Sequence, residues 1–279
     1  MSAGEGGGDP AARAAALAEA FPPEPEREES RAGCERLLPE AVEAAERCAA
    51  AGEGLEHAAR LFFLAGRFEV ARGRYQEARG LLERAAAARE RAHGGADPRV
   101  ALDLTYLNGA LLHLGDRAGM VRNAARAVEI FTAAHGERHR TTVTHINNLG
   151  TILHRSGDPA GARAQFERAL SLIPEVWGTR HPFFATVSSN LGDVLAELGD
   201  AEGARRLYER ALEVDEAAYG PHYSSVARDL LKLGTLLAAL EETEAARPLL
   251  ERALAFYEPQ LGADHPHVAA LRESVARLG

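Results

Sequence analysis

The chain has 279 residues, of which 46% are hydrophobic and 6% aromatic, and its formal net charge at pH 7 is −9. A negative balance of this size disfavours non-specific binding to nucleic acid or anionic lipid. No apolar run approaches the roughly 20 residues that a membrane helix needs, and the N-terminus lacks the layout of a secretion signal. We therefore expect a cytoplasmic protein that has neither nucleic acid nor membrane as a partner.

The first 54 residues differ in composition from the rest of the chain. Residues 1–30 are rich in Gly, Ala, Pro and Glu, which predicts a mobile N-terminal segment, although Ala11 to Ala20 could form a short helix. Residues 31–54 are predicted to hold an N-terminal capping helix, with an amphipathic pattern over 33–51. Both cysteines, Cys34 and Cys48, lie here, and on one helix about 21 Å would separate them. That distance excludes a disulfide, and two buried thiols in a reducing compartment are the simplest interpretation.

Residues 55–279 repeat with a period of 42 residues. Two glycine series show the period, the first interrupted only by Glu241: Gly73, Gly115, Gly157 and Gly199, then Gly94, Gly136, Gly178, Gly220 and Gly262. Glycine at such places predicts helix ends, and a fixed period of this length indicates a solenoid of helix pairs. We expect five such units and a final capping helix over 267–279. Histidines recur after the second glycine, at His139, His181 and His265, and are predicted to cap the next helix.

Apolar residues within each unit follow the helical period. Alanine occupies one slot in all five units, at Ala85, Ala127, Ala169, Ala211 and Ala253. A small residue lets two helices approach closely, and large residues are expected to fill the gap beside it, at Leu82, Phe166, Tyr208 and Leu250. A further alanine slot has one exception, Met120.

Three short motifs carry a resemblance to a known family: Asn148-Leu149-Gly150, Asn190-Leu191-Gly192 and Lys232-Leu233-Gly234. They resemble the tetratricopeptide signature, and the loops Gly178 to Pro182 and Gly262 to Pro266 are similar to the 42-residue kinesin-light-chain variety. The resemblance implies an all-α fold, a right-handed superhelical solenoid of about five helix-turn-helix repeats with an N-terminal and a C-terminal capping helix. It also implies that the first helix of each pair lines a concave groove.

A second resemblance lies before the repeats, in Phe21-Pro22-Pro23 and in Cys34 to Pro39. These pieces look like the junction that leads into the repeat arm of bacterial STAND-type signalling ATPases. The sequence has no Gly-x-x-x-x-Gly-Lys-Ser/Thr loop for phosphate binding. The resemblance therefore implies a sensor or adaptor arm without its ATPase.

Groove-facing positions can be assigned from the apolar stripe of each first helix. The positions predicted to bind a partner are Thr144, Asn147, Asn148, Thr151, His154, Arg155, Ser189, Asn190, Asp193, Glu197, Arg228 and Lys232. In the resembled family, an Asn in the slot of Asn148 and Asn190 commonly holds the main chain of an extended peptide, since an amide is both donor and acceptor. Alternatively, these amides bind a neighbouring repeat. The predicted function is a scaffold or adaptor that binds a protein or an extended peptide.

Lys232, the single lysine of the chain, could attract a carboxylate together with Arg228 and Arg155. The alternative is a solvated surface charge. Catalysis by this amine would need burial that lowers its pKa, for which the sequence offers no sign.

Three alternatives stay open. A cluster of His113, His154, Asp193 and Glu197 could form a metal or acid–base site, which would make the chain an enzyme or a small-molecule binder. The apolar positions Leu102, Tyr106 and Leu112 could support self-association. The N-terminal 30 residues could occupy the groove. We predict no catalytic residue, no metal and no cofactor.

Overall fold

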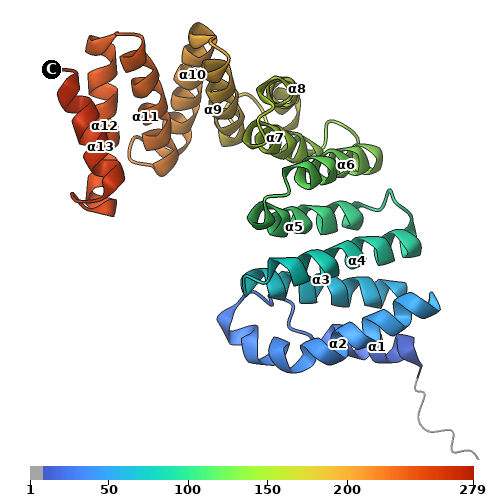
Figure 1. The fold of residues 1–279 in the computed structure, drawn as a ribbon. Coiled ribbons are helices and arrows are strands. Elements are labelled where there is room, and N and C mark those ends of the chain that lie inside the picture. Colours follow the sequence, from blue (N-terminus) through green and yellow to red (C-terminus); the bar gives the residue numbers. More distant parts are fainter. Residues whose placement is uncertain (1–8) are drawn as a thin grey trace, which may run out of the picture. The chain divides into compact units, whose positions relative to one another are not determined.

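The computed structural model describes residues 9–279, which form thirteen α-helices and one short 3-10 helix, without a strand in that range (Figure 1). The chain divides into two compact units. The first ends at His145 and the second begins at Ile146, so the boundary falls inside one helix. The prediction of an all-α helical repeat architecture is confirmed.

The helices have regular lengths and alternate along the chain. The first unit contains α1 (Pro10–Ala20), η1 (Glu28–Ser30), α2 (Arg31–Ala51), α3 (Leu55–Ala71), α4 (Tyr75–His93), α5 (Pro98–Leu114) and α6 (Arg117–His135). The boundary helix is α7 (Arg140–Arg155). The second unit continues with α8 (Pro159–Val176), α9 (Pro182–Glu197), α10 (Ala201–Tyr219), α11 (Ser224–Ala239), α12 (Thr243–Leu261) and α13 (Pro266–Arg277).

Side-chain caps set where many of these helices begin. Asp116, Asp158 and Asp200 each accept a hydrogen bond at 2.8 Å from the backbone N–H three residues later, which satisfies a donor left free by the first turn. The predicted role of the loop histidines is confirmed. The Nδ1 atoms of His181 and His265 accept from the backbone N–H two residues on, at 3.1 and 3.2 Å, and the Nδ1 of His139 does so at 3.3 Å.

In four of the five repeats a glycine on the first helix faces a large side chain on the second. A β-carbon at Gly150 would lie 2.7 Å from the ring of Phe166, and one at Gly192 would lie 2.5 Å from the ring of Tyr208. In the second repeat the larger residue lies on the first helix and the smaller one on the second. Asn108 stands in the glycine slot, and the residue opposite is the small Ala124. The Asn108 side chain then donates to the carbonyl of Met120 at 3.2 Å, so the departures of this repeat from the pattern belong together.

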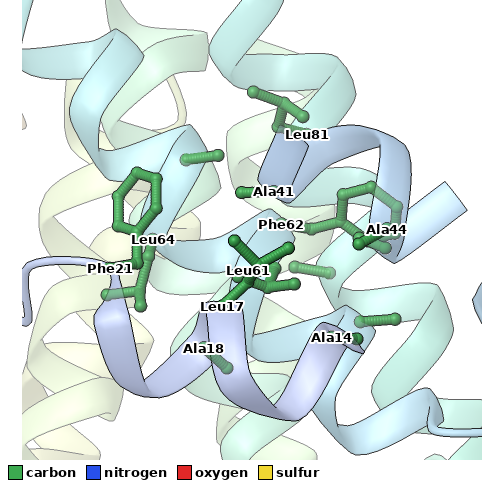
Figure 2. Packing of buried hydrophobic residues seen from close by; sticks show 14 of the residues in the cluster. Ala14, Leu17, Ala18, Phe21, Ala41, Ala44, Leu61, Phe62, Leu64 and Leu81 are labelled. Carbon is green, nitrogen blue, oxygen red and sulfur yellow. The ribbon is translucent and has the colours of Figure 1, made fainter. Parts of the chain in front are cut away.

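The N-terminal residues differ from the expectation of a mobile segment over 1–30. Residues 10–20 form α1, whose Ala14, Leu17 and Ala18 are buried in one cluster with residues of α2 and α3 (Figure 2). Phe21 follows α1 and is also buried. Small alanines let α1 lie close to its neighbours, so the thin apolar face that made the sequence look weakly helical is sufficient here. Residues 1–8 lie outside the described part of the chain.

The capping helix predicted over 31–54 corresponds to α2, which packs on both α1 and α3. The two cysteines are free and buried, and both lie on this one helix. Burial raises the pKa of each thiol, which keeps the thiols protonated and weakly reactive.

Glu241 is the one described non-glycine residue with a left-handed backbone, with φ of 63°, in the slot where the preceding unit has Gly199 with φ of 84°. A side chain in this conformation is strained. We therefore expect Glu241→Gly to raise the free energy of unfolding of the second unit by about 0.5–1 kcal/mol, after the entropy cost of glycine is subtracted. Urea unfolding followed by fluorescence of Trp177, the single tryptophan, measures this. The reverse change, Gly199→Glu, should lower stability, and a loss of stability in Glu241→Gly would contradict the argument.

Candidate functional site

The predicted binding residues of the second unit lie on the first helices of its pairs, α9 and α11, and on the part of α7 that belongs to it. Side-chain hydrogen bonds connect these helices. We call the surface formed by Asn148, Asn190, Asp193 and Lys232 the polar face. Since its contacts join residues 39 to 43 positions apart, adjacent repeats build it jointly.

The asparagines divide into one buried and two accessible amides. Asn147 is buried, and its Oδ1 accepts a hydrogen bond from Nδ2 of Asn190 at 3.2 Å. Asn190 is half-buried, so it contacts a neighbouring repeat while part of its amide still faces outward. Asn148 is exposed. Asn148 is therefore the amide most open to a partner, and Asn147 serves to hold Asn190 in place.

Lys232 is held by two groups of α9. Its Nζ donates to Oδ2 of Asp193 at 2.7 Å and to Oγ of the buried Ser189 at 2.9 Å. The Tyr208 hydroxyl donates to the other carboxylate oxygen of Asp193 at 2.7 Å. Burial, with the nearby charge of Asp193, raises the pKa of Tyr208. Asp193 of the same chain thus compensates the charge of the Lys232 ammonium. This differs from both predicted roles of Lys232, the attraction of a partner carboxylate and a solvated charge.

Arg228 and Arg155 do not join Lys232 as one basic patch. Arg228 lies 3.4 Å from Asp229 and 3.7 Å from Asp215, both buried carboxylates. Arg155 is an exposed residue at the end of α7. Each guanidinium therefore has its own surroundings.

Other predicted residues lie on α7 and α9. His154 Nε2 lies 2.6 Å from Oε2 of Glu197, which places this pair at the ends of α7 and α9. Thr151 donates to the carbonyl of Asn147 at 3.2 Å, and Thr144 is half-buried.

The histidine and carboxylate cluster of the alternative prediction does not assemble. His154 pairs with Glu197, whereas Asp193 is engaged by Lys232 and Tyr208. In the first unit, His113 stacks on Tyr75 with ring centroids 4.0 Å apart. Over residues 9–279, no group of three or more His, Cys, Asp or Glu residues is arranged to hold a metal ion.

Sequence reasoning missed the polar role of Tyr208. It predicted this residue as a space-filling member of a slot that also holds Leu82, Phe166 and Leu250, and the ring does pack there. The one signal available was its hydroxyl, the single polar atom in that set of side chains. A buried tyrosine needs a hydrogen-bond partner, and Asp193 is the partner.

The first unit presents a different surface on α5. Leu102, Tyr106 and Leu112 expose 44%, 44% and 49% of their area, which makes this helix face more apolar than the polar face of the second unit. Tyr106 meets Phe63 of α3 edge-on at 5.0 Å, and the Arg67 guanidinium lies 5.3 Å from the Tyr106 ring. The predicted apolar stripe is thus present, and its use in self-association stays a prediction.

Comparison with known proteins identifies the repeats. Models of the tetratricopeptide repeat match residues 103–175 and 183–258, and a related tetratricopeptide model matches residues 65–99. Together these matches cover more than half of the chain. The resemblance of residues 21–39 to STAND-type ATPases stays a prediction, because the matches begin at residue 65.

Solved structures share the fold at low identity. The kinesin light chain repeats of Podosopora anserina match with a TM-score of 0.64 and 19% identity, over 73% of this chain and 97% of that one. BtubC from P. vanneervenii matches with a TM-score of 0.63 and 20% identity, over 82% of this chain and 91% of that one. The apo form of RapI matches with a TM-score of 0.68 and 18% identity, over 84% of this chain and 62% of that one.

Comparison with the curated proteins gave no match. Among the helices of residues 9–279, none is long and apolar enough to pass through a membrane. The identification therefore rests on the 42-residue period, the paired helices and the matched repeat models, and by these the chain belongs to the tetratricopeptide repeat family.

Proposed function

We propose that the protein is an adaptor whose polar face binds an extended segment of a partner protein. Stacked helix pairs offer long binding surfaces, which is the general use of such arrays. The observation that supports the proposal most is the hydrogen-bonded connection of α7, α9 and α11 through Asn147–Asn190 and Ser189–Lys232–Asp193.

These contacts hold the polar side chains in place before a partner arrives. Lys232 and Asp193 form an ion pair. Lys232 also donates a hydrogen bond to Ser189, and Tyr208 donates one to Asp193. A surface that is ordered in advance loses less conformational entropy on binding. The exposed amide of Asn148 and the accessible part of Asn190 can then donate to carbonyls and accept from N–H groups of a peptide main chain.

The charge balance of the face favours a particular class of partner. Lys232 is compensated by Asp193, and His154 lies against Glu197. A strongly acidic or basic peptide would find no uncompensated countercharge in the Lys232–Asp193 pair. We therefore expect the bound segment to be recognised through its main chain and neutral polar side chains.

The test is affinity capture from extract of the source cells, followed by affinity measurement with the purified partner. The variant Asn148→Ala/Asn190→Ala/Lys232→Ala should weaken binding by about 10- to 100-fold, the effect of losing one or two strong contacts. Circular dichroism should show that the variant keeps its helices.

The chain offers a matched control on its second helices. Glu167, Glu209 and Glu251 are exposed and recur at the 42-residue spacing on α8, α10 and α12. Their triple alanine variant removes three exposed ion pairs with Arg163, Arg205 and Arg247, each worth little to stability. Equal affinity of both triple variants for the partner would contradict binding at the polar face.

A further inference from the structure

The junctions between successive repeats share one structural slot that the polar face does not use. A residue near the end of each second helix and the residue fourteen positions later, on the next first helix, hold equivalent places in each junction. The four junctions fill the slot differently, with Arg89 and Asp103, Phe131 and His145, Ile173 and Val187, and Asp215 and Asp229.

Three of these pairs are chemically matched. Arg89 donates to Asp103 with Nε 2.8 Å from Oδ2. The rings of Phe131 and His145 lie 4.3 Å apart between centroids, and Ile173 and Val187 are two fully buried aliphatic side chains. The last junction, between α10 and α11, places two carboxylates in the slot instead.

Both carboxylates at this junction are deeply buried, with Asp215 exposing 1% of its area and Asp229 none. They share one guanidinium, because Arg228 lies 3.7 Å from Oδ2 of Asp215 and 3.4 Å from Oδ1 of Asp229. Oδ1 of Asp215 and Oδ2 of Asp229 have no hydrogen-bond partner. One partly exposed arginine at these distances does not compensate two buried negative charges.

The other groups around the pair supply little positive charge. Ser189 of α9 hydrogen bonds to Asp229, and burial raises the pKa of Tyr257 of α12, with the charge of Asp229 adding to the rise and that of Arg228 opposing it. The charge of Asp229 also contributes to the raised pKa of Tyr208. Lys232, four residues after Arg228 on α11, is bound to Asp193 through a 2.7 Å ion pair.

A proton bound to one of the two carboxylates removes this imbalance of charge. Burial, together with the charge of Asp215, raises the pKa of Asp229 to about 6, although Arg228 opposes the rise. Two adjacent carboxylates in a low-dielectric site favour a state in which one of them is neutral.

We propose that Asp215 and Asp229 form a proton-binding pair that makes the packing of the C-terminal repeat, α11 to α13, on α10 dependent on pH. The folded state holds the proton more tightly than the unfolded state does. The stabilisation is fully present below the pKa of an unfolded aspartate, about 4, and is lost as pH rises through about 6. The C-terminal repeat therefore opens more readily at neutral pH than at mildly acidic pH.

Hydrogen exchange of the full chain between pH 4 and 7.5, corrected for intrinsic exchange rates, tests the pair. In the wild type, the opening equilibrium of α11 and α12 should increase by about 10- to 100-fold over this range, because a shift of two pKa units corresponds to a factor of about 100. In Asp229→Asn the increase should vanish, with protection near pH 7 above that of the wild type. Equal pH dependence in the two proteins would overturn the proposal.

A second variant keeps the test decisive if Asp229→Asn folds poorly. The double change Asp215→Ile/Asp229→Val copies the buried pair Ile173 and Val187 of the preceding junction, and it should be at least as protected as the wild type at pH 7 and insensitive to pH. Asp103→Asn is the positional control, because it removes a buried carboxylate from the first unit and should leave the pH dependence of α11 and α12 unchanged. A change there with Asp103→Asn would contradict a local origin.

Discussion

Replacing Phe166 by alanine is expected to lower the free energy of unfolding of the second unit by about 3–5 kcal/mol, the usual cost of removing a fully buried aromatic ring. Phe166 exposes 1% of its area and fills the space above Gly150. Urea unfolding followed by fluorescence of Trp177 reports on this unit, since Trp177 is the single tryptophan and belongs to it.

The second repeat suggests how the loss can be rescued. Gly150→Asn alone should also destabilise, because its β-carbon would lie 2.7 Å from the Phe166 ring. The double variant Gly150→Asn/Phe166→Ala copies Asn108 and Ala124, so its loss should fall below the sum of the two single losses by at least about 1 kcal/mol. Strictly additive losses would mean that the two residues do not share one space.

Replacing Arg89 by alanine is expected to cost the first unit about 3–5 kcal/mol at pH 7, because it leaves a buried carboxylate without its partner. The Arg89 side chain is 7% exposed and that of Asp103 is 1% exposed, with 2.8 Å between Arg89 Nε and Asp103 Oδ2. Thermal unfolding followed by circular dichroism, combined with hydrogen exchange in α4 and α5, measures the loss and its position.

The loss in Arg89→Ala should depend on pH. Burial raises the pKa of Asp103 to about 6 even beside Arg89, and removing the guanidinium raises it further. As pH falls towards 6, Asp103 becomes protonated in the variant before it does so in the wild type. The difference in stability should therefore shrink and level off below about 6, where both proteins carry the protonated carboxyl. The double variant Arg89→Ile/Asp103→Val copies the apolar junction of Ile173 and Val187 and should be close to wild type in stability. A double variant as unstable as Arg89→Ala would show that the missing charge partner is not the cause.

Much of the fold could be predicted from the sequence. The glycine spacing, the Ala85-type slot and the capping histidines depend on local backbone geometry, and each recurs at the same place in successive units. Helix boundaries and repeat type follow from such local signals, because each helix satisfies its own backbone hydrogen bonds. The assignment of groove positions on α9 and α11 from the apolar stripe stays a prediction.

The sequence was less informative for α1, because its composition did not show how closely this helix packs. Residues 10–20 have a thin apolar face, and only the alanine-lined contact with α2 and α3 shows that this face is enough to bury α1. The length and alternation of the later helices were visible in the period, whereas this helix has no counterpart in it.

The sequence by itself determined the repeat family, the helix pairs and the residues that line each first helix. Only the tertiary structure decided which polar and charged side chains meet: Lys232 with Asp193, His154 with Glu197, and Asp215 with Asp229 around Arg228. The physical reason is that a helix arises from contacts within a few residues, whereas an ion pair depends on side-chain conformation and burial at a junction of two repeats. A periodic pattern specifies that residues 42 positions apart occupy equivalent places, but the polar atoms that come within 3 Å of each other are set by the packing around them.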